Sequence, residues 1–337
     1  TGSGAFLLLA ALSTQLHRFG QPPEVVAVVR PFFLLNSLSL IPVFYFQVQR
    51  QYLDALGRPW VGTSVMLTDV GLNALLNWMF IWGHLGAPAL GLTGSGVATL
   101  IARTLAVSAI ALWLRRERAP VGRLERGRFR AMLQMGVPAA GSLLFESGAF
   151  AMAMLMMGWL GAVPLAAHQI ALSCAAFTFM FPLGLSMAVS IRISRALGEG
   201  RREVLRAIGF GTYGFGCIIM VCFATTFVAA GGLLAAGFTG DPVVITLAAR
   251  LLIVAAIFQL FDGGQVIAAG ALRGLTDVKV PTLITFIAYW VLSLPTGYML
   301  AFHSALGPVG IWTGLASGLA CAAVLLGWRF HRLTRLR

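Results

Sequence analysis

The amino-acid sequence predicts an all-α protein that crosses a membrane many times. The prediction rests on the composition, a series of long apolar runs, and the alternation of charge between those runs. Of the 337 residues, 58% are hydrophobic and 10% are charged, against about 25% charged in a typical soluble domain. A water-soluble fold of this length has too little interior to bury so much apolar surface.

The apolar runs set the number of expected helices. Ten runs are bounded by charge, Gly or Pro, at residues 4–16, 26–49, 60–83, 90–114, 131–158, 164–191, 207–234, 243–269, 280–303 and 308–330. Nine of these runs reach the roughly 20 residues that a helix needs to cross a bilayer, and the first is short. We therefore expect about ten transmembrane helices.

The charged residues predict how these helices are oriented. The net charge is +13, and twenty of the 24 basic residues lie in alternate loops and in the C-terminal tail. The intervening loops at 84–89, 159–163, 235–242 and 304–307 contain no Lys or Arg. By the positive-inside rule the basic loops and the C-terminus are cytoplasmic. The positive charge thus indicates membrane topology rather than nucleic-acid binding.

Four short matches recur in order along the chain and indicate an internal duplication. They are Arg30 with Arg250, Gln47-Val48 with Gln265-Val266, Ala89-Leu90-Gly91-x-x-Gly94 with Ala305-Leu306-Gly307-x-x-Gly310, and Trp113 with Trp328, at separations of 220, 218, 216 and 215 residues. The offset moves each span onto the sixth span after it, so both copies have the same orientation, as parallel repeats do.

The duplication predicts how the chain is divided. We expect an N-terminal lobe at 1–114, a basic cytoplasmic linker at 115–130, and a C-terminal lobe of six helices at 131–337. The spans at 131–158 and 164–191 have no partners in the first copy. We therefore expect about 85 further residues with two helices before residue 1, which would make twelve helices in two lobes.

Two carboxylates lie inside the predicted spans of the second lobe. Glu146 is near the middle of the span 131–158, and Asp262 is in the cytoplasmic half of the span 243–269. A charged carboxylate at the bilayer centre costs about 2.5–3.5 kcal/mol on insertion scales, so such residues are functional candidates. They suit a proton carrier or a cation site. The alternative is a structural hydrogen bond between helices.

Three polar residues follow one another at helical spacing in the first lobe. Asp69, Asn73 and Asn77 lie four residues apart in the span 60–83, so their side chains share one helix face. They form either a cation track or a polar seam between helices, and the sequence favours neither. His168, at the outer start of a span, is interpreted as a capping or interface residue.

Motifs for hydrolysis and nucleotide binding are absent from the sequence. It contains no HExxH, GxxxxGK[ST] or GxSxG, so it offers no support for an intramembrane enzyme, which remains the alternative from a different functional class. The four cysteines lie in apolar runs without CxxC spacing, so we expect neither disulfides nor a zinc site.

Several longer segments resemble a known family. These are Leu144–Gly148 (LFESG), Ala166–Leu172 (AAHQIAL), Phe181–Met187 (FPLGLSM), Arg195–Gly200 (RALGEG), Phe258–Asp262 (FQLFD) and Gly270–Asp277 (GALRGLTD). In this order they resemble the bacterial NorM-like branch of the multidrug and toxic compound extrusion (MATE) transporters. The resemblance extends over the whole chain and is strongest from 131 to 280.

This resemblance implies a twelve-helix, two-lobe antiporter in the bacterial cytoplasmic membrane. Such a protein exports small cationic amphiphiles in exchange for protons or sodium by alternating access, acts as a monomer, and needs no cofactor beyond the coupling ion. The second-lobe carboxylate pair of the family maps onto Glu146 and Asp262, which become the candidate sodium ligands. Its first-lobe asparagines map onto Asn73 and Asn77.

The chain departs from some relatives at two positions. Phe258 stands where they carry Tyr, and Ser173 where they carry Asn, and both changes remove an oxygen ligand. The nearest alternative function is that of a related flippase for lipid-linked oligosaccharides. A flippase needs cationic groups to hold pyrophosphate within the membrane, yet Arg103 is the one deeply placed arginine.

Overall fold

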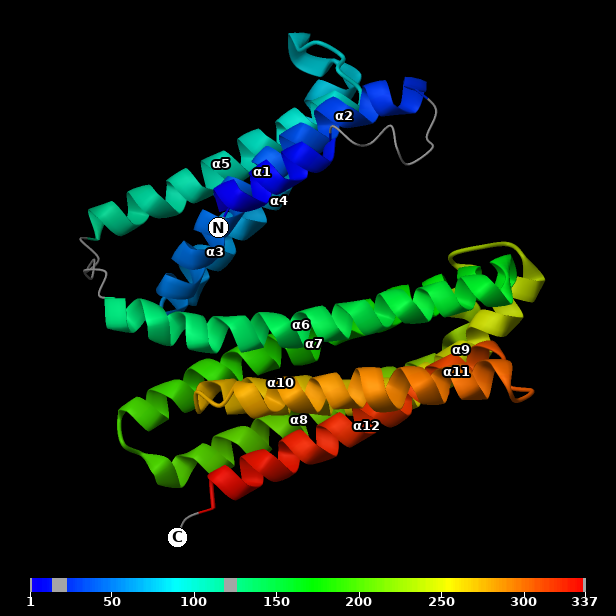
Figure 1. Ribbon diagram of the computed structural model, residues 1–337. Coiled ribbons are helices and arrows are strands. Elements are labelled where there is room, and N and C mark those ends of the chain that lie inside the picture. Colours follow the sequence, from blue (N-terminus) through cyan, green and yellow to red (C-terminus); the bar gives the residue numbers. More distant parts are fainter. Residues whose placement is uncertain (1, 14–22, 118–125, 336–337) are drawn as a thin grey trace. The chain divides into compact units, whose positions relative to one another are not determined.

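The computed structural model describes residues 2–13, 23–117 and 126–335, and within these ranges the regular structure is helical. Nine described helical segments are long and apolar enough to cross a membrane, and a shorter apolar helix precedes them. The predicted all-α, multi-span fold is therefore confirmed. The chain separates into two compact units, Thr1–Arg123 and Leu124–Arg337, drawn in Figure 1.

Unit 1 is organised around its last helix. It contains α1 (Gly2–Ser13), α2 (Pro23–Leu38), α3 (Leu40–Ala55), α4 (Pro59–Trp82) and α5 (Leu92–Arg116). Helix α5 packs against α2, α3 and α4. The buried residues of α5 are small ones such as Gly96, Ala98 and Ala102. Small side chains allow membrane helices to approach closely, since there is no hydrophobic force to draw them together in lipid.

One predicted span of unit 1 is interrupted. The run 26–49 forms α2 and α3, which are separated at Ser39. Pro42 lies three residues later and has no backbone N–H for the Leu38 carbonyl, so one helical hydrogen bond is missing there. The neighbouring bonds survive, because Ser39 N donates to Leu35 O at 3.0 Å and Val43 N donates to Ser39 O at 3.2 Å.

Unit 2 is organised around α9. It contains α6 (Arg126–Leu160), α7 (Ala162–Gly198), α8 (Leu205–Ala236), α9 (Pro242–Gly274), α10 (Lys279–Phe286), α11 (Leu294–Phe302) and α12 (Pro308–Leu333). Helix α9 packs against α7, α8 and α12. Helix α6 begins five residues earlier than the predicted span, because the arginines at 126, 128 and 130 are good helix formers. Residues 118–125 of the predicted linker lie outside the described residues.

Helix α9 also approaches α7 very closely. A Cβ atom on Gly274 would lie 2.7 Å from the Ser190 carbonyl oxygen, and Gly270 is pressed against the backbone of Ser186. Only a residue without a side chain fits at such positions. The last turns of α9 are thereby fixed against α7.

A π-helical segment, η4 (Ile287–Ser293), joins α10 to α11. Figure 1 shows α10 and α11 lying end to end, so this predicted span is one continuous rod. Pro295 lies just after the segment and has no N–H for a helical bond to the Val291 carbonyl. A wider π turn is a usual accommodation of such a local fault, and such turns are frequent at functional sites.

Ionic contacts secure the loops at one end of unit 2. Arg329 Nε donates to Asp277 Oδ2 at 2.5 Å, which ties the turn after α9 to α12. At the end of α7, hydrogen bonds from Arg201 and Arg195 hold the pKa of Glu199 below its usual value. Glu199 is exposed, so this contact is screened by solvent and salt.

We predict that two identical substitutions on α12 have opposite effects on stability. A Cβ on Gly314 would clash with the backbone of Gly297 on α11, whereas the Cβ position of Gly327 is open. Gly314→Ala should therefore destabilise the protein by about 1–3 kcal/mol through overpacking. Gly327→Ala should stabilise it by up to about 1 kcal/mol through helix propensity. Thermal unfolding in detergent measures both, and a Gly314→Ala variant as stable as Gly327→Ala would contradict this packing.

Candidate functional site

The structure brings Glu146 and Asp262 together in unit 2. Glu146 lies on α6 and is half-buried, while Asp262 lies on α9 and is 6% exposed. The two carboxylates are close enough to interact electrostatically. Asp262 Oδ1 is buried and accepts no hydrogen bond from the residues that the structure describes. A buried carboxylate oxygen without a donor is costly, so it has the capacity to take up a proton or a cation.

Tyr289, which the sequence analysis did not select, completes this group. It lies on η4 and is 0% exposed. Its hydroxyl donates a hydrogen bond to Gln265 Oε1 on α9 at 3.4 Å and lies beside the Glu146 side chain. The hydroxyl therefore joins the helix that carries one carboxylate to the helix that carries the other.

A second pair of polar side chains supports α9 next to Asp262. Thr178 Oγ1 on α7 donates to Gln259 Oε1 at 2.9 Å, and both side chains are buried. Gln259 precedes Asp262 by about one turn, so the two share a helix face. Gln259 Nε2 is buried without a hydrogen-bond partner in the described part of the chain. This buried amide donor is thus free to bind a ligand oxygen.

Aromatic rings form a wall beside the carboxylates. Phe150 and Phe258 meet edge to face at 6.0 Å, and Phe258 meets Trp312 at 5.3 Å. Trp312 Nε1 donates to His168 Nδ1 at 3.2 Å. The neutral His168 ring then carries its proton on Nε2, which is buried with no described partner. The interpretation of His168 as an interface residue agrees with this contact.

The predicted polar face of unit 1 divides into two parts. Asn77 Nδ2 donates to Asn73 O at 2.8 Å and to Asn73 Oδ1 at 3.0 Å. Asn73 Nδ2 in turn lies 3.4 Å from Thr99 Oγ1 on α5. These hydrogen bonds are the ones expected if the asparagines form a polar seam between α4 and α5. A role for the asparagines as cation ligands remains a prediction.

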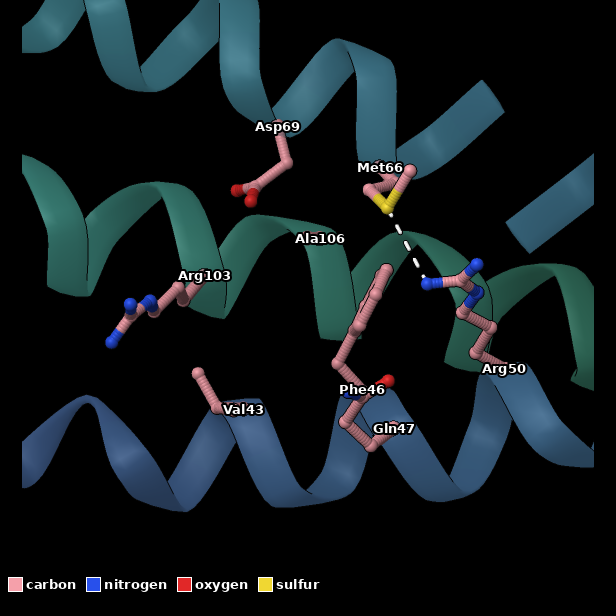
Figure 2. A pocket seen from close by; sticks show the side chains of 8 residues that line it. All are labelled: Val43, Phe46, Gln47, Arg50, Met66, Asp69, Arg103 and Ala106. Carbon is pink, nitrogen blue, oxygen red and sulfur yellow. Dashed lines mark hydrogen bonds between the residues drawn. The ribbon is translucent and has the colours of Figure 1, made fainter. Parts of the chain in front are cut away.

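Asp69 has different surroundings from the asparagines. It lines a cavity of about 150 Å³ between α3, α4 and α5, together with Arg50 and Arg103 (Figure 2). Asp69 Oδ1 is buried and has no hydrogen-bond partner among the described residues. The structure therefore places Asp69 beside cationic groups that the sequence analysis did not associate with it.

The side chains that the sequence analysis missed share one property. Tyr289, Thr178, Gln259 and Gln265 are uncharged polar residues inside apolar runs. Such residues occur throughout membrane helices as structural hydrogen-bond partners. Their relation to the carboxylates depends on contacts between helices, which the local sequence does not reveal.

Long apolar helices, with a pair of carboxylates inside them, define a multi-pass membrane protein. Residues 138–299 match the sequence profile of the MatE family. The chain is 39% identical over 334 residues to the probable multidrug resistance protein NorM of Mesorhizobium japonicum, covering 95% of this chain and 72% of that protein. It is 40% identical over 346 residues to a protein of the same name from Pseudomonas putida, covering 98% and 75%. The chain belongs to the MATE family.

A solved structure shares this fold. It is titled as the outward-facing conformation of a multidrug resistance MATE family transporter of the MOP superfamily, and the TM-score is 0.90. The two chains are 19% identical, and the match covers 99% of this chain and 77% of the other. The likeness supports the helical arrangement described above.

We predict that the Thr178–Gln259 hydrogen bond stabilises α9 near the site. Thr178→Val keeps the side-chain shape but leaves the buried Gln259 amide without its donor, which should cost about 1–3 kcal/mol. Thr225→Val is the matched control, since the Thr225 hydroxyl is exposed and bonds only its own helix at Val221 O. Thermal unfolding in detergent compares the two. Equal melting temperatures for the two variants would show that the buried bond is dispensable.

Proposed function

We propose that this protein is a secondary active antiporter that exports small cationic amphiphiles in exchange for protons or sodium. The observation that carries the proposal is the pairing of the half-buried Glu146 with the buried Asp262, with the Tyr289 hydroxyl beside them. Intramembrane carboxylates are expensive and mark ion or substrate pathways. The relatives from Mesorhizobium japonicum and Pseudomonas putida are named as probable multidrug resistance proteins, which supports drug export.

The site chemistry favours cations. Two carboxylates, a phenol hydroxyl and the Gln265 amide oxygen are hard oxygen ligands, which suit sodium as well as a proton or an ammonium group. The rings of Phe150 and Phe258 stand beside them. Aromatic faces attract desolvated organic cations. An amphiphile that carries both a positive charge and apolar surface matches this combination.

Competition for one negative charge provides the coupling. When a proton or sodium neutralises Glu146 and Asp262, the organic cation loses its counter-charge and is released. Binding of the organic cation in turn expels the ion, because the coupling between two ligands is reciprocal. Alternation of the two lobes between inward-open and outward-open states then exchanges one for the other across the membrane.

The setting proposed for this activity follows from the charge pattern and the relatives. The protein lies in the bacterial cytoplasmic membrane with its C-terminus in the cytoplasm, since the basic loops and tail occupy one side. It works as a monomer. Its reaction moves a ligand without making or breaking covalent bonds, so it is not an enzyme and requires no cofactor apart from the coupling ion.

We predict that Glu146→Gln and Asp262→Asn each abolish coupled export. Each change removes the exchangeable charge and preserves shape. The assay is ethidium efflux from proteoliposomes, with proton and sodium gradients imposed separately, which also identifies the coupling ion. Glu203→Gln is the control and should transport normally, because Glu203 is an exposed carboxylate in the short 3₁₀ turn (Arg202–Val204) before α8. Normal efflux by both site variants would refute the proposed mechanism.

We predict a smaller effect for the Tyr289 hydroxyl. Tyr289→Phe keeps the buried ring but removes the hydroxyl that bonds Gln265 and lies beside Glu146, and a hydrogen bond of this kind is worth about 0.5–1.5 kcal/mol. Affinity for ethidium or for the coupling ion should change by up to about tenfold. Tyr298→Phe, at a 43% exposed tyrosine on α11, is the matched control. Identical affinities in both variants would remove Tyr289 from the site.

A further inference from the structure

The cavity of unit 1 contains more positive than negative charge. It is lined by Val43, Phe46, Gln47, Arg50, Met66, Asp69, Arg103 and Ala106. Two guanidinium groups and one carboxylate are its charged members, and its remaining walls are largely apolar. Figure 2 shows Asp69 and Arg103 toward one end, Arg50 and Met66 toward the other, and the Phe46 ring between them.

Neither arginine is neutralised by a carboxylate in the described structure. Arg103 Nη1 donates to Ser39 Oγ at 2.5 Å and lies 3.5 Å from Asn36 Oδ1, both neutral acceptors. Arg50 Nη1 donates to the Met66 sulfur at 3.4 Å, and a thioether is a weak acceptor. Both guanidinium groups therefore keep their full charge and most of their donor capacity.

Asp69 faces Arg103 without binding it. Its carboxylate extends from α4 into the cavity on the same side as Arg103 (Figure 2), yet the two groups form no ion pair. Asp69 Oδ1 remains buried and without a hydrogen bond in the described structure. Arg103 bonds Ser39 and Asn36 and forms no ion pair with Asp69, so part of its guanidinium group remains available to a different anion.

The size of the cavity limits what it can hold. A volume of about 150 Å³ is well below the roughly 300–1,000 Å³ typical of sites for drug-sized molecules. A single aromatic ring with a carboxylate is a ligand of suitable size. The Phe46 ring and the Met66 thioether offer apolar contact to such a ring, and arginine recognises carboxylates by paired hydrogen bonds.

We propose that this cavity is a binding site for a small aromatic anion, whose carboxylate is held by Arg103 and opposed by Asp69. The site is independent of the cation site in unit 2, since it is built from α3, α4 and α5 alone. It extends the range of ligands for this protein from cations to small organic anions.

The test uses three probes of nearly the same shape. Benzoate, benzamide and benzamidinium differ mainly in charge, and their binding to the purified protein in detergent can be measured by titration calorimetry and ligand-observed NMR. We expect benzoate to bind at least tenfold more tightly than benzamide, and benzamidinium not to bind to this cavity. Equal affinities for benzoate and benzamide would overturn the proposal.

Three variants assign the binding to the cavity. Arg103→Gln should weaken benzoate binding by about ten- to a hundredfold, the range for a lost charge-assisted hydrogen bond. Arg30→Gln, an exposed arginine on α2, is the matched control and should bind normally. Asp69→Asn should bind benzoate more tightly, because it removes the opposing charge. Weaker benzoate binding in Asp69→Asn, or equal losses in both arginine variants, would overturn the proposal.

Two further variants test whether misfolding, or benzoate binding in unit 2, explains the result. If Arg103→Gln does not fold, Arg103→Lys takes its place. Lysine keeps the charge but loses the paired hydrogen bonds of the guanidinium group, so benzoate should bind more weakly, and an unchanged benzoate affinity would overturn the proposal. Glu146→Gln should bind benzoate like the unmodified protein, because Glu146 belongs to unit 2. Loss of benzoate binding in Glu146→Gln would place the anion in the unit 2 site and overturn the proposal, whether or not the protein exports cations.

Discussion

The absence of water from the bilayer core is the constraint on which the rest of this structure depends. Every backbone N–H and C=O within the membrane must find a partner inside its own segment, and an α-helix does so without help from neighbouring segments. The backbone N–H and C=O groups are therefore hydrogen-bonded almost everywhere, so the side chains determine the chemistry of the protein. Polar side chains in the membrane must either bond to one another or remain available to a ligand. The buried atoms without partners, such as Asp262 Oδ1 and Gln259 Nε2, are the informative ones.

The two units meet this constraint with different degrees of packing. In unit 2, α9 contacts three other helices, and glycines bring its backbone against that of α7. This close packing holds Asp262 and Gln259 in a defined relation to α6 and η4. In unit 1, few large side chains are buried, and the charged groups of α3, α4 and α5 surround an open cavity. Rigid surroundings suit a site that discriminates between a proton, a sodium ion and an organic cation.

The helical backbone is irregular at two places, near Pro42 and before Pro295. The fault near Pro42 separates α2 from α3 and brings Ser39, at the break, into contact with Arg103. The π segment before Pro295 contains Tyr289, whose hydroxyl reaches Glu146. In both cases a proline that removes one backbone hydrogen bond lies within a few residues of a polar contact between helices. Irregular backbone of this kind is tolerated in a membrane where neighbouring helices enclose it.

The sequence by itself determined the helical spans and the family, because hydropathy, charge alternation and motif spacing are properties of short segments. The internal duplication stays a prediction. The sequence also identified Glu146 and Asp262, since a carboxylate in an apolar run is conspicuous without any structure. Only the tertiary structure selected Tyr289 and Thr178, and only it placed Asp69 in a cavity with Arg50 and Arg103. These relations join helices that are distant in the chain. The rotation of each helix about its own axis decides them, and packing between helices sets that rotation.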